Sequence, residues 1–169
     1  LALAAATLHE PELLFLDEPT SAVDPQSRRD FWESLFVLCD AGTTILVSTH
    51  YMDEAERCHS LAILDRGALV ASGSPRRLMQ EIAETVLEIE AADLRAARAV
   101  LADLDAVASV AQLGTRLHAL VDAALERPAD EIRGALAGAG VEAAVEIVEA
   151  SLEDVFVSVT RRRGAERPP

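Results

Sequence analysis

The N-terminal half of the chain contains two short apolar runs that predict buried strands. Residues 12–17 (ELLFLD) are too few for a helix and apolar through their centre, which is typical of a strand covered on both faces of a parallel sheet. Residues 43–50 (TTILVSTH) have the same character and again end in polar side chains. Helix-forming residues 1–8 precede the first run and end before Pro11.

An amphipathic helix is predicted between these two strands. Asp24 can cap it, Pro25 suits its first position, and Gly42 ends it. Its buried stripe follows helical spacing through four residues: Trp32, Leu35, Phe36 and Cys39.

Further elements follow the second strand. We expect a short acidic helix at 52–57, a β-hairpin within 60–73 and a capped helix at 75–82. The alternation of helices and strands predicts an α/β layer fold for residues 1–83.

A different pattern occupies residues 84–160. It predicts a strand, helix, strand, strand, helix and strand, at 85–91, 97–104, 107–114, 115–122, 126–137 and 141–150. This β-α-β-β-α-β order is that of a ferredoxin-like α+β unit. We therefore predict a second, smaller domain at 84–160.

A last helix is expected from Ser151, whose hydroxyl can cap the Asp154 amide. Its predicted buried residues are Leu152, Val155, Phe156 and Val159. The arginine-rich residues 161–169 predict a disordered tail.

Composition narrows the classes of function. The 169 residues carry a formal net charge of -14, and all basic residues are arginine. This balance argues against nucleic acid as a partner, because phosphate backbones are held by clustered Lys and Arg. No apolar stretch reaches the roughly 18–20 residues that span a bilayer. Because the chain opens on Leu1 in helix-like composition, we expect it to be a fragment of a longer protein.

Three polar residues at strand ends are the candidates for chemistry. Asp17 and Glu18 follow the first apolar run, and His50 ends the second. Carboxyl ends of strands are the ligand-binding edge of open α/β sheets. Neighbouring acids point to opposite sides, so one could hold Mg²⁺ while the other faces an attacking water. Taken singly, the two acids could equally be a solvated strand end, and His50 a surface histidine.

The joint pattern resembles the ATP-binding cassette (ABC) transporter ATPases. LLFLDEP looks like their Walker B strand, SAVD their D-loop and LVSTH their switch-histidine strand. YMDEAE and LAILDRGALVASGSPRRL are similar to the stretches that follow in transporter members. ASLEDVFVSVTRR resembles the ending of drug-resistance and ABC-2 type exporters. The resemblance implies the C-terminal part of a P-loop NTPase cassette, followed by a small accessory domain.

The resemblance also implies residue roles. Asp17 would help to hold Mg²⁺, Glu18 would be the general base or water-positioning acid, and His50 would contact the γ-phosphate of ATP. Ser21 and Asp24 would lie at the interface of two ATPase subunits that face head to tail. The other implied partner is a transmembrane permease, so the protein would be cytoplasmic and peripheral on the inner face of the cell membrane.

The departures from the family limit this interpretation. A phosphate-binding loop needs G-x-x-x-x-G-K-[ST], and the chain has no lysine. The glutamine-loop segment and the glycine-rich signature are also missing. We therefore expect the chain alone neither to bind ATP tightly nor to hydrolyse it. The alternatives are a truncated, non-catalytic product that acts through its C-terminal assembly module, and a non-transport ABC protein. The remaining histidines, His9, His59 and His118, are predicted to lie at the surface.

Overall fold

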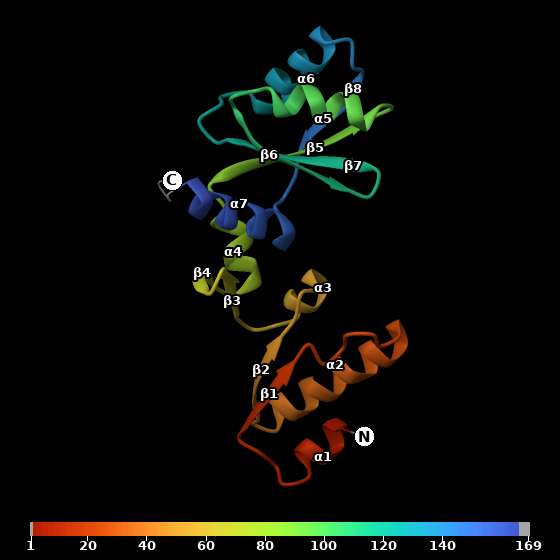
Figure 1. The fold of residues 1–169 in the computed structure, drawn as a ribbon, viewed down its shortest axis with the longest axis vertical. Helices are drawn as coiled ribbons and strands as arrows, with labels where there is room; N and C mark the ends of the chain where they lie inside the picture. Colours follow the sequence, from red (N-terminus) through yellow and green to blue (C-terminus); the bar gives the residue numbers. More distant parts are fainter. Residues whose placement is uncertain (1, 166–169) are drawn as a thin grey trace. The chain divides into compact units, whose positions relative to one another are not determined.

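The computed structural model describes residues 2–165 and divides the chain into two compact units, 1–55 and 56–169 (Figure 1). The predicted domain boundary between residues 83 and 84 stays a prediction. The division between the two compact units falls earlier in the chain, between residues 55 and 56. Segments that follow this point contact the C-terminal helix and so belong to the second unit.

The first unit is built on two parallel strands. Its elements are α1 (Ala2–Thr7), β1 (Leu13–Asp17), α2 (Pro25–Asp40), β2 (Thr44–Ser48) and α3 (Met52–Ala55). The chain runs β1-α2-β2, and α2 packs against the strand pair through the buried side chains of Trp32 and Leu35. The Asp24 carboxylate caps α2 by accepting from the amides of Gln26 and Ser27, as the sequence predicts.

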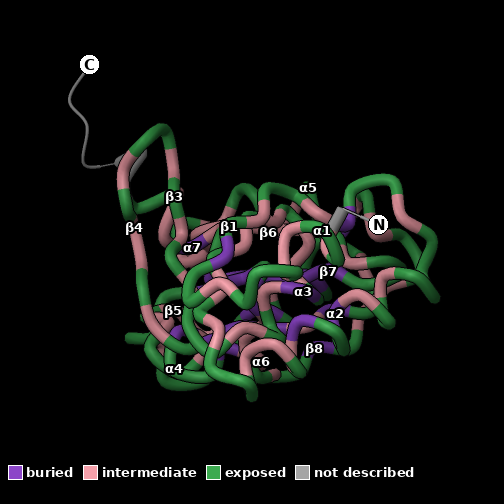
Figure 2. The backbone as a smooth tube through the Cα atoms, turned by 90° about the horizontal axis from the view of Figure 1, so that it is seen from below, coloured by how far each residue is buried: buried purple, intermediate pink, exposed green. Residues whose placement is uncertain are grey.

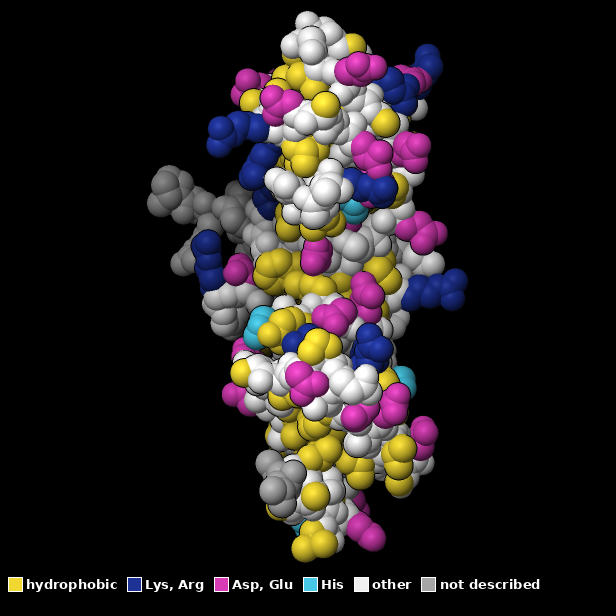
Figure 3. Space-filling model, turned by 90° about the vertical axis from the view of Figure 1, so that its right-hand side faces the viewer, with side chains coloured by type: hydrophobic (Ala, Val, Ile, Leu, Met, Phe, Trp, Pro, Cys, Tyr) yellow, Lys and Arg dark blue, Asp and Glu magenta, His cyan; other side chains and the backbone are white. Residues whose placement is uncertain are grey.

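The strand pair is covered on one face only, where Leu14 of β1 is buried and the covered residues of β2 are only partly buried, which corrects the prediction that both faces are covered. Along β1, exposure alternates, with Leu14 buried and its neighbours Leu13 and Phe15 49% and 67% exposed. Phe15 pairs with Leu46 of β2, which is 59% exposed. The reason is that α2 covers one side of the strand pair, and no other element of the described residues covers the opposite side enough to bury these side chains. Apolar side chains of this unit therefore reach the surface. Figure 3 shows one face of the molecule, on which hydrophobic side chains lie among acidic and basic ones.

The second unit begins with a hairpin and a short helix. These elements are β3 (Leu61–Asp65), β4 (Ala68–Gly73) and α4 (Pro75–Gln80). Arg66 and Gly67 form the turn with φ of 46° and 77°, the left-handed pair that a two-residue hairpin requires. Neither strand contains a buried residue, and Figure 2 shows both in the exposed and intermediate colours.

A four-stranded antiparallel sheet forms the rest of this unit. Its elements are β5 (Glu84–Ala91), α5 (Leu94–Ala102), β6 (Val107–Leu113), β7 (Arg116–Asp122), α6 (Pro128–Gly138), β8 (Ala143–Ile147) and α7 (Leu152–Ala165). The strand order is β6-β7-β5-β8, so β5, the first strand of this sheet along the chain, lies in the interior of the sheet.

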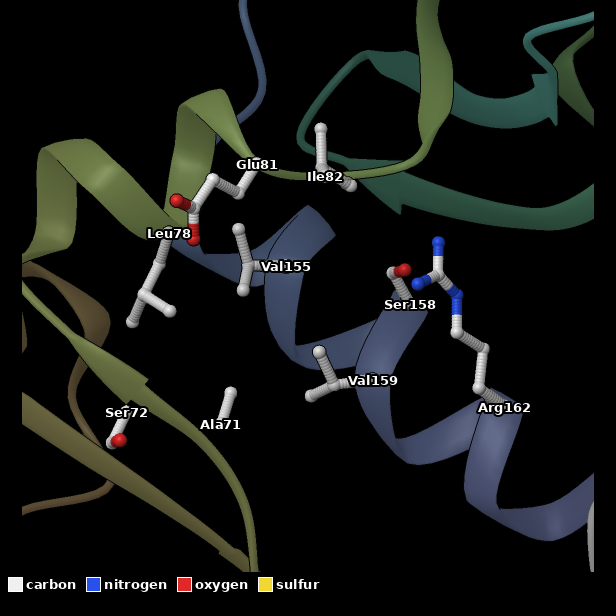
Figure 4. Close-up of a pocket in the computed structure, with 9 residues that line it drawn as sticks. All are labelled: Ala71, Ser72, Leu78, Glu81, Ile82, Val155, Ser158, Val159 and Arg162. Carbon is white, nitrogen blue, oxygen red and sulfur yellow. The ribbon is translucent and has the colours of Figure 1, made fainter.

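The two faces of this sheet are covered differently. Helices α5 and α6 cover one face and close the main core around Leu87, Leu101, Leu117 and Leu136, each fully buried. Helix α7 contacts β7 on the other face and also α4 and β4 (Figure 1). A pocket of about 220 Å³ opens between β4, α4 and α7 (Figure 4).

The contacts of α7 correct three predictions. Phe156 is 39% exposed, whereas the polar residues Asp154 and Ser158 are buried. His118, predicted at the surface, is 9% exposed and lies with Nδ1 3.1 Å from Asp154 Oδ1. The helix also continues through residues 161–165, which were predicted to be disordered, while residues 166–169 of that tail lie outside the described residues.

Candidate active site

The parallel pairing of β1 with β2 places the ends of both strands side by side. Asp17 pairs in register with Ser48, so the two last strand residues are neighbours. The Ser48 hydroxyl donates to Asp17 Oδ1 at 2.5 Å. This adjacency of the two strands is the feature that brings the predicted site residues together.

Glu18 leaves the strand in a strained backbone conformation. Its φ is 41°, in the left-handed region, which costs a non-glycine residue about 1–3 kcal/mol. The strain is held by its amide, which donates to the carbonyl oxygen of Ser48 at 3.1 Å and to the Ser48 hydroxyl at 3.0 Å. Backbone strain of this kind is concentrated at functional sites.

Glu18 and His50 face each other. The distance from His50 Nδ1 to Glu18 Oε1 is 3.3 Å, and the side chains are 56% and 51% exposed. A polar contact this open to water contributes little to stability. The His50 ring also lies against that of Tyr51, with centroids 4.2 Å apart. The pair therefore presents a carboxylate and an imidazole together, both accessible to solvent.

Ser21 and Asp24 lie in the loop that joins β1 to α2, and both are exposed. The Ser21 amide donates to the Glu18 carbonyl at 3.1 Å, and Ala22 has a φ of 61°. Hydrogen bonds from the side chain and amide of Ser27 lower the pKa of Asp24 below its ordinary value. Asp24 is thus an ionised helix cap, and the structure does not bring either residue into contact with His50.

Two residues that sequence reasoning missed belong to this arrangement. Ser48 joins Asp17 to the Glu18 amide, and its only signal was the polar ending of the second apolar run. Glu54 is fully buried and accepts hydrogen bonds from Thr20 and Thr49. A single glutamate in an acidic segment gave no signal of burial.

The oxygen donors at the strand ends are few. The part of the chain that the structure describes contains no cluster of three or more His, Cys, Asp or Glu side chains that could hold a metal ion. The Asp17 carboxylate accepts from the Ser48 hydroxyl through Oδ1, and that hydroxyl also accepts from the Glu18 amide. Mg²⁺ in proteins keeps most of its waters and takes one or two carboxylates together with substrate phosphates, so Asp17 is the group here that could hold it.

The carboxyl ends of parallel strands, where Asp17, Glu18 and His50 lie, are the edge at which open α/β sheets bind ligands. The chain is 39% identical over 166 residues to the Nod factor export ATP-binding protein I of Burkholderia thailandensis, covering 96% of this chain and 51% of that protein. It is 51% identical over 83 residues to the probable multidrug ABC transporter ATP-binding protein YbhF of Escherichia coli, covering 49% of this chain and 14% of that protein. The chain is 47% identical over 95 residues to the Nod factor export ATP-binding protein I of Burkholderia pseudomallei, covering 55% of this chain and 31% of that protein. No family model matches the chain.

The homologues of the chain are therefore ATP-binding proteins of ABC transporters. It spans about half or less of the length of each of these three relatives. In residues 2–165, no helix combines the length and the apolar character that crossing a membrane requires.

Proposed function

We propose that this chain is part of the ATP-hydrolysing subunit of an ABC-type exporter, in which ATP hydrolysis is coupled to transport through a separate membrane permease. The observation that carries the proposal is the meeting of Asp17, Glu18 and His50 at the carboxyl edge of paired parallel strands. Homology to ABC transporter ATP-binding proteins supports it. The names of the relatives, which refer to multidrug transport and Nod factor export, favour an exporter.

In this proposal, Glu18 orients the attacking water and accepts its proton. His50, 3.3 Å from Glu18, keeps the carboxylate directed and donates to the terminal phosphate. Asp17, whose Oδ1 accepts from the Ser48 hydroxyl, would help to hold Mg²⁺. The bound Mg²⁺ would neutralise charge on the β- and γ-phosphates of ATP.

The chain's own residues fit the hydrolytic half of such a site better than the phosphate-binding half. The Asp17 carboxylate is of the kind that Mg²⁺ takes in proteins, and the exposed Glu18–His50 pair leaves room for water. The chain has no lysine with which to hold the phosphates. We therefore propose that it neither binds ATP tightly nor hydrolyses it unless the missing phosphate-binding groups are supplied.

The partners and the location follow from the same proposal. The exposed loop with Ser21 and Asp24 would face a second ATPase subunit arranged head to tail. The subunit would lie in the cytoplasm, against the inner face of the membrane that holds the permease.

We also propose that residues 84–160 form a ferredoxin-like accessory domain after the cassette part at 1–83. The order β-α-β-β-α-β and the sheet order β6-β7-β5-β8 support this. The separate core around Leu87 and Leu101 is a further argument, because a domain needs its own buried apolar centre.

The test is the substitution Glu18→Gln in the complete protein, assembled with its permease. Turnover of ATP should be lost while binding of ATP is retained, because the amide keeps the shape of the side chain and loses its basicity. Glu33→Gln, at an exposed position of α2, is the matched control and should hydrolyse ATP like the wild type. Near-wild-type turnover by Glu18→Gln would show that another residue is the base.

A further inference from the structure

Glu54 is a buried carboxylate with no role in the chemistry described so far. It lies in α3, and its exposed fraction is 0%. Burying a carboxylate is costly unless its oxygens are hydrogen-bonded and its charge is compensated. The cost has to be offset by specific contacts, and these contacts lead to the candidate active site.

Each carboxylate oxygen of Glu54 holds one of the two loops that carry the candidate site. The Thr20 hydroxyl donates to Oε1 at 2.6 Å, and the Thr49 hydroxyl donates to Oε2 at 2.8 Å. Thr20 follows Glu18 by two residues, and Thr49 directly precedes His50. One carboxylate therefore bridges the loop after β1 and the loop after β2.

A cation from α2 completes the arrangement. Arg28 Nε lies 3.5 Å from Glu54 Oε1, and the side chain of Arg28 is 24% exposed. The same guanidinium lies over the ring of Tyr51, 4.3 Å from its centroid, and that ring lies against His50. The Tyr51 amide also donates to the Thr49 hydroxyl at 3.0 Å. The His50 loop is thus held at its backbone and at its ring.

We infer that Glu54 is a positioning residue for the Glu18–His50 pair. Its carboxylate fixes the two loops at the spacing that brings Glu18 and His50 within 3.3 Å. The inference rests on the proposed function, because it assigns Glu54 a purpose in the hydrolytic step. If Glu54 had only a structural role, any two hydrogen-bond donors could satisfy its carboxylate. Its donors are instead Thr20 and Thr49, which lie within two residues of Glu18 and His50.

The experiment compares Glu54→Gln with Asp53→Asn in the complete protein with its permease. Asp53 is the adjacent exposed acid of the same short helix, so the control removes the same charge. An amide has one acceptor oxygen and no charge, so Glu54→Gln can accept from only one of the two threonine hydroxyls and no longer compensates the charge of Arg28. We expect kcat to fall about 100-fold, with the KM for ATP changed less than threefold, as for a misplacement of catalytic groups of about 1 Å. Asp53→Asn should leave both constants unchanged.

The threonines supply a second route if Glu54→Gln does not fold. Thr49→Val removes the hydroxyl at nearly constant shape and should lower kcat, whereas Thr49→Ser retains the hydroxyl and should restore it. The double variant Thr20→Val/Glu54→Gln should lower kcat by less than the product of the two single effects, because both substitutions act on the same hydrogen bond. In the chain itself, the imidazole resonances of His50 should move in Thr49→Val and stay in Asp53→Asn.

The outcomes separate this inference from the proposed function. If Glu18→Gln abolishes turnover but Glu54→Gln and Thr49→Val behave like the wild type, the positioning role is wrong and the proposed function stands. If Glu18→Gln retains turnover, the proposed function fails whatever Glu54→Gln does. A rise in KM without a change in kcat would also overturn the positioning role.

Discussion

The buried ionic contact between β5 and α7 provides a quantitative test of the second unit. The Glu84 side chain is 9% exposed and accepts from the Ser158 hydroxyl at 2.7 Å and from Arg162 Nη2 at 3.0 Å. Substituting Glu84→Ala leaves the Ser158 hydroxyl, on a residue 1% exposed, without its acceptor. The same substitution leaves Arg162 without this ion pair.

The magnitude follows from these two contacts. A hydrogen bond to a charged group contributes about 1.5–3 kcal/mol. The Arg162 side chain is 45% exposed, so its ion pair is screened and adds only about 0.2–1 kcal/mol. We expect Glu84→Ala to lower the free energy of unfolding by about 2 kcal/mol at neutral pH. For a chain of this size, that corresponds to a fall in Tm of roughly 4–8 °C.

The loss should depend on pH. Burial acts to raise the pKa of Glu84, but the hydrogen bond from Ser158 and the charge of Arg162 outweigh it and bring the pKa below its usual 4.5. A group whose pKa is depressed by folding stabilises the protein above its unfolded pKa. That contribution is lost as the pH falls through the folded pKa. The difference between the wild type and Glu84→Ala should therefore be full above about pH 5.5 and should shrink as the pH falls below 4.5 and through the lowered pKa of the folded state.

The assay is thermal and urea unfolding of both proteins, followed by circular dichroism between pH 7 and pH 3. Glu81→Ala, at an exposed position just after α4, is the control and should change the unfolding free energy by less than about 0.5 kcal/mol. A difference between wild type and Glu84→Ala that stays constant across this pH range would refute the reasoning.

Two further predictions concern the same unit. Leu101→Ala empties a fully buried position between α5 and the sheet and should cost about 2–5 kcal/mol in urea unfolding, whereas Arg98→Ala on the exposed face of α5 should cost little. Equal midpoints for the two would contradict the core as described. His118→Ala removes the ring that meets buried Asp154 and should cost about 1–3 kcal/mol in thermal unfolding, and the exposed His59→Ala is its control. A melting curve unchanged from wild type would mean that the His118 contact contributes nothing.

The sequence predicted the order of the elements because that order depends on local signals. The stripe with Leu101 has helical period, Asp24 and Pro25 mark a helix start, and the Arg66–Gly67 turn marks a hairpin. Each signal involves residues close in the chain, so no tertiary information was needed. These elements formed within a few residues of their predicted bounds.

The sequence did not predict which faces are covered, because this depends on contacts between distant segments. Phe15 was expected to be buried from its apolar neighbours, yet its face of the strand pair is open. His118 was expected at the surface because its partner, Asp154, follows 36 positions later. The candidate site residues were predicted from their positions at the ends of strands: Asp17, Glu18 and His50. The sequence did not show that these ends lie side by side, which follows from the pairing of β1 with β2. The burial of Glu54 could not be predicted, because nothing in the sequence indicates that Thr20 and Thr49 donate to the same carboxylate.

The interior place of β5 in its sheet has a consequence for how the protein is made. A ribosome releases β5 before either of its neighbours, β7 and β8, exists. The hydrogen bond to Glu84 cannot form at this stage, because its donor Ser158 lies 74 positions later in the chain. Within this sheet of the described residues, the β6–β7 hairpin can pair early, because its partners are close in sequence. Until β8 and α7 emerge, the apolar side of β5 has no permanent cover, so a nascent chain paused at this stage is the form most exposed to aggregation and to capture by chaperones.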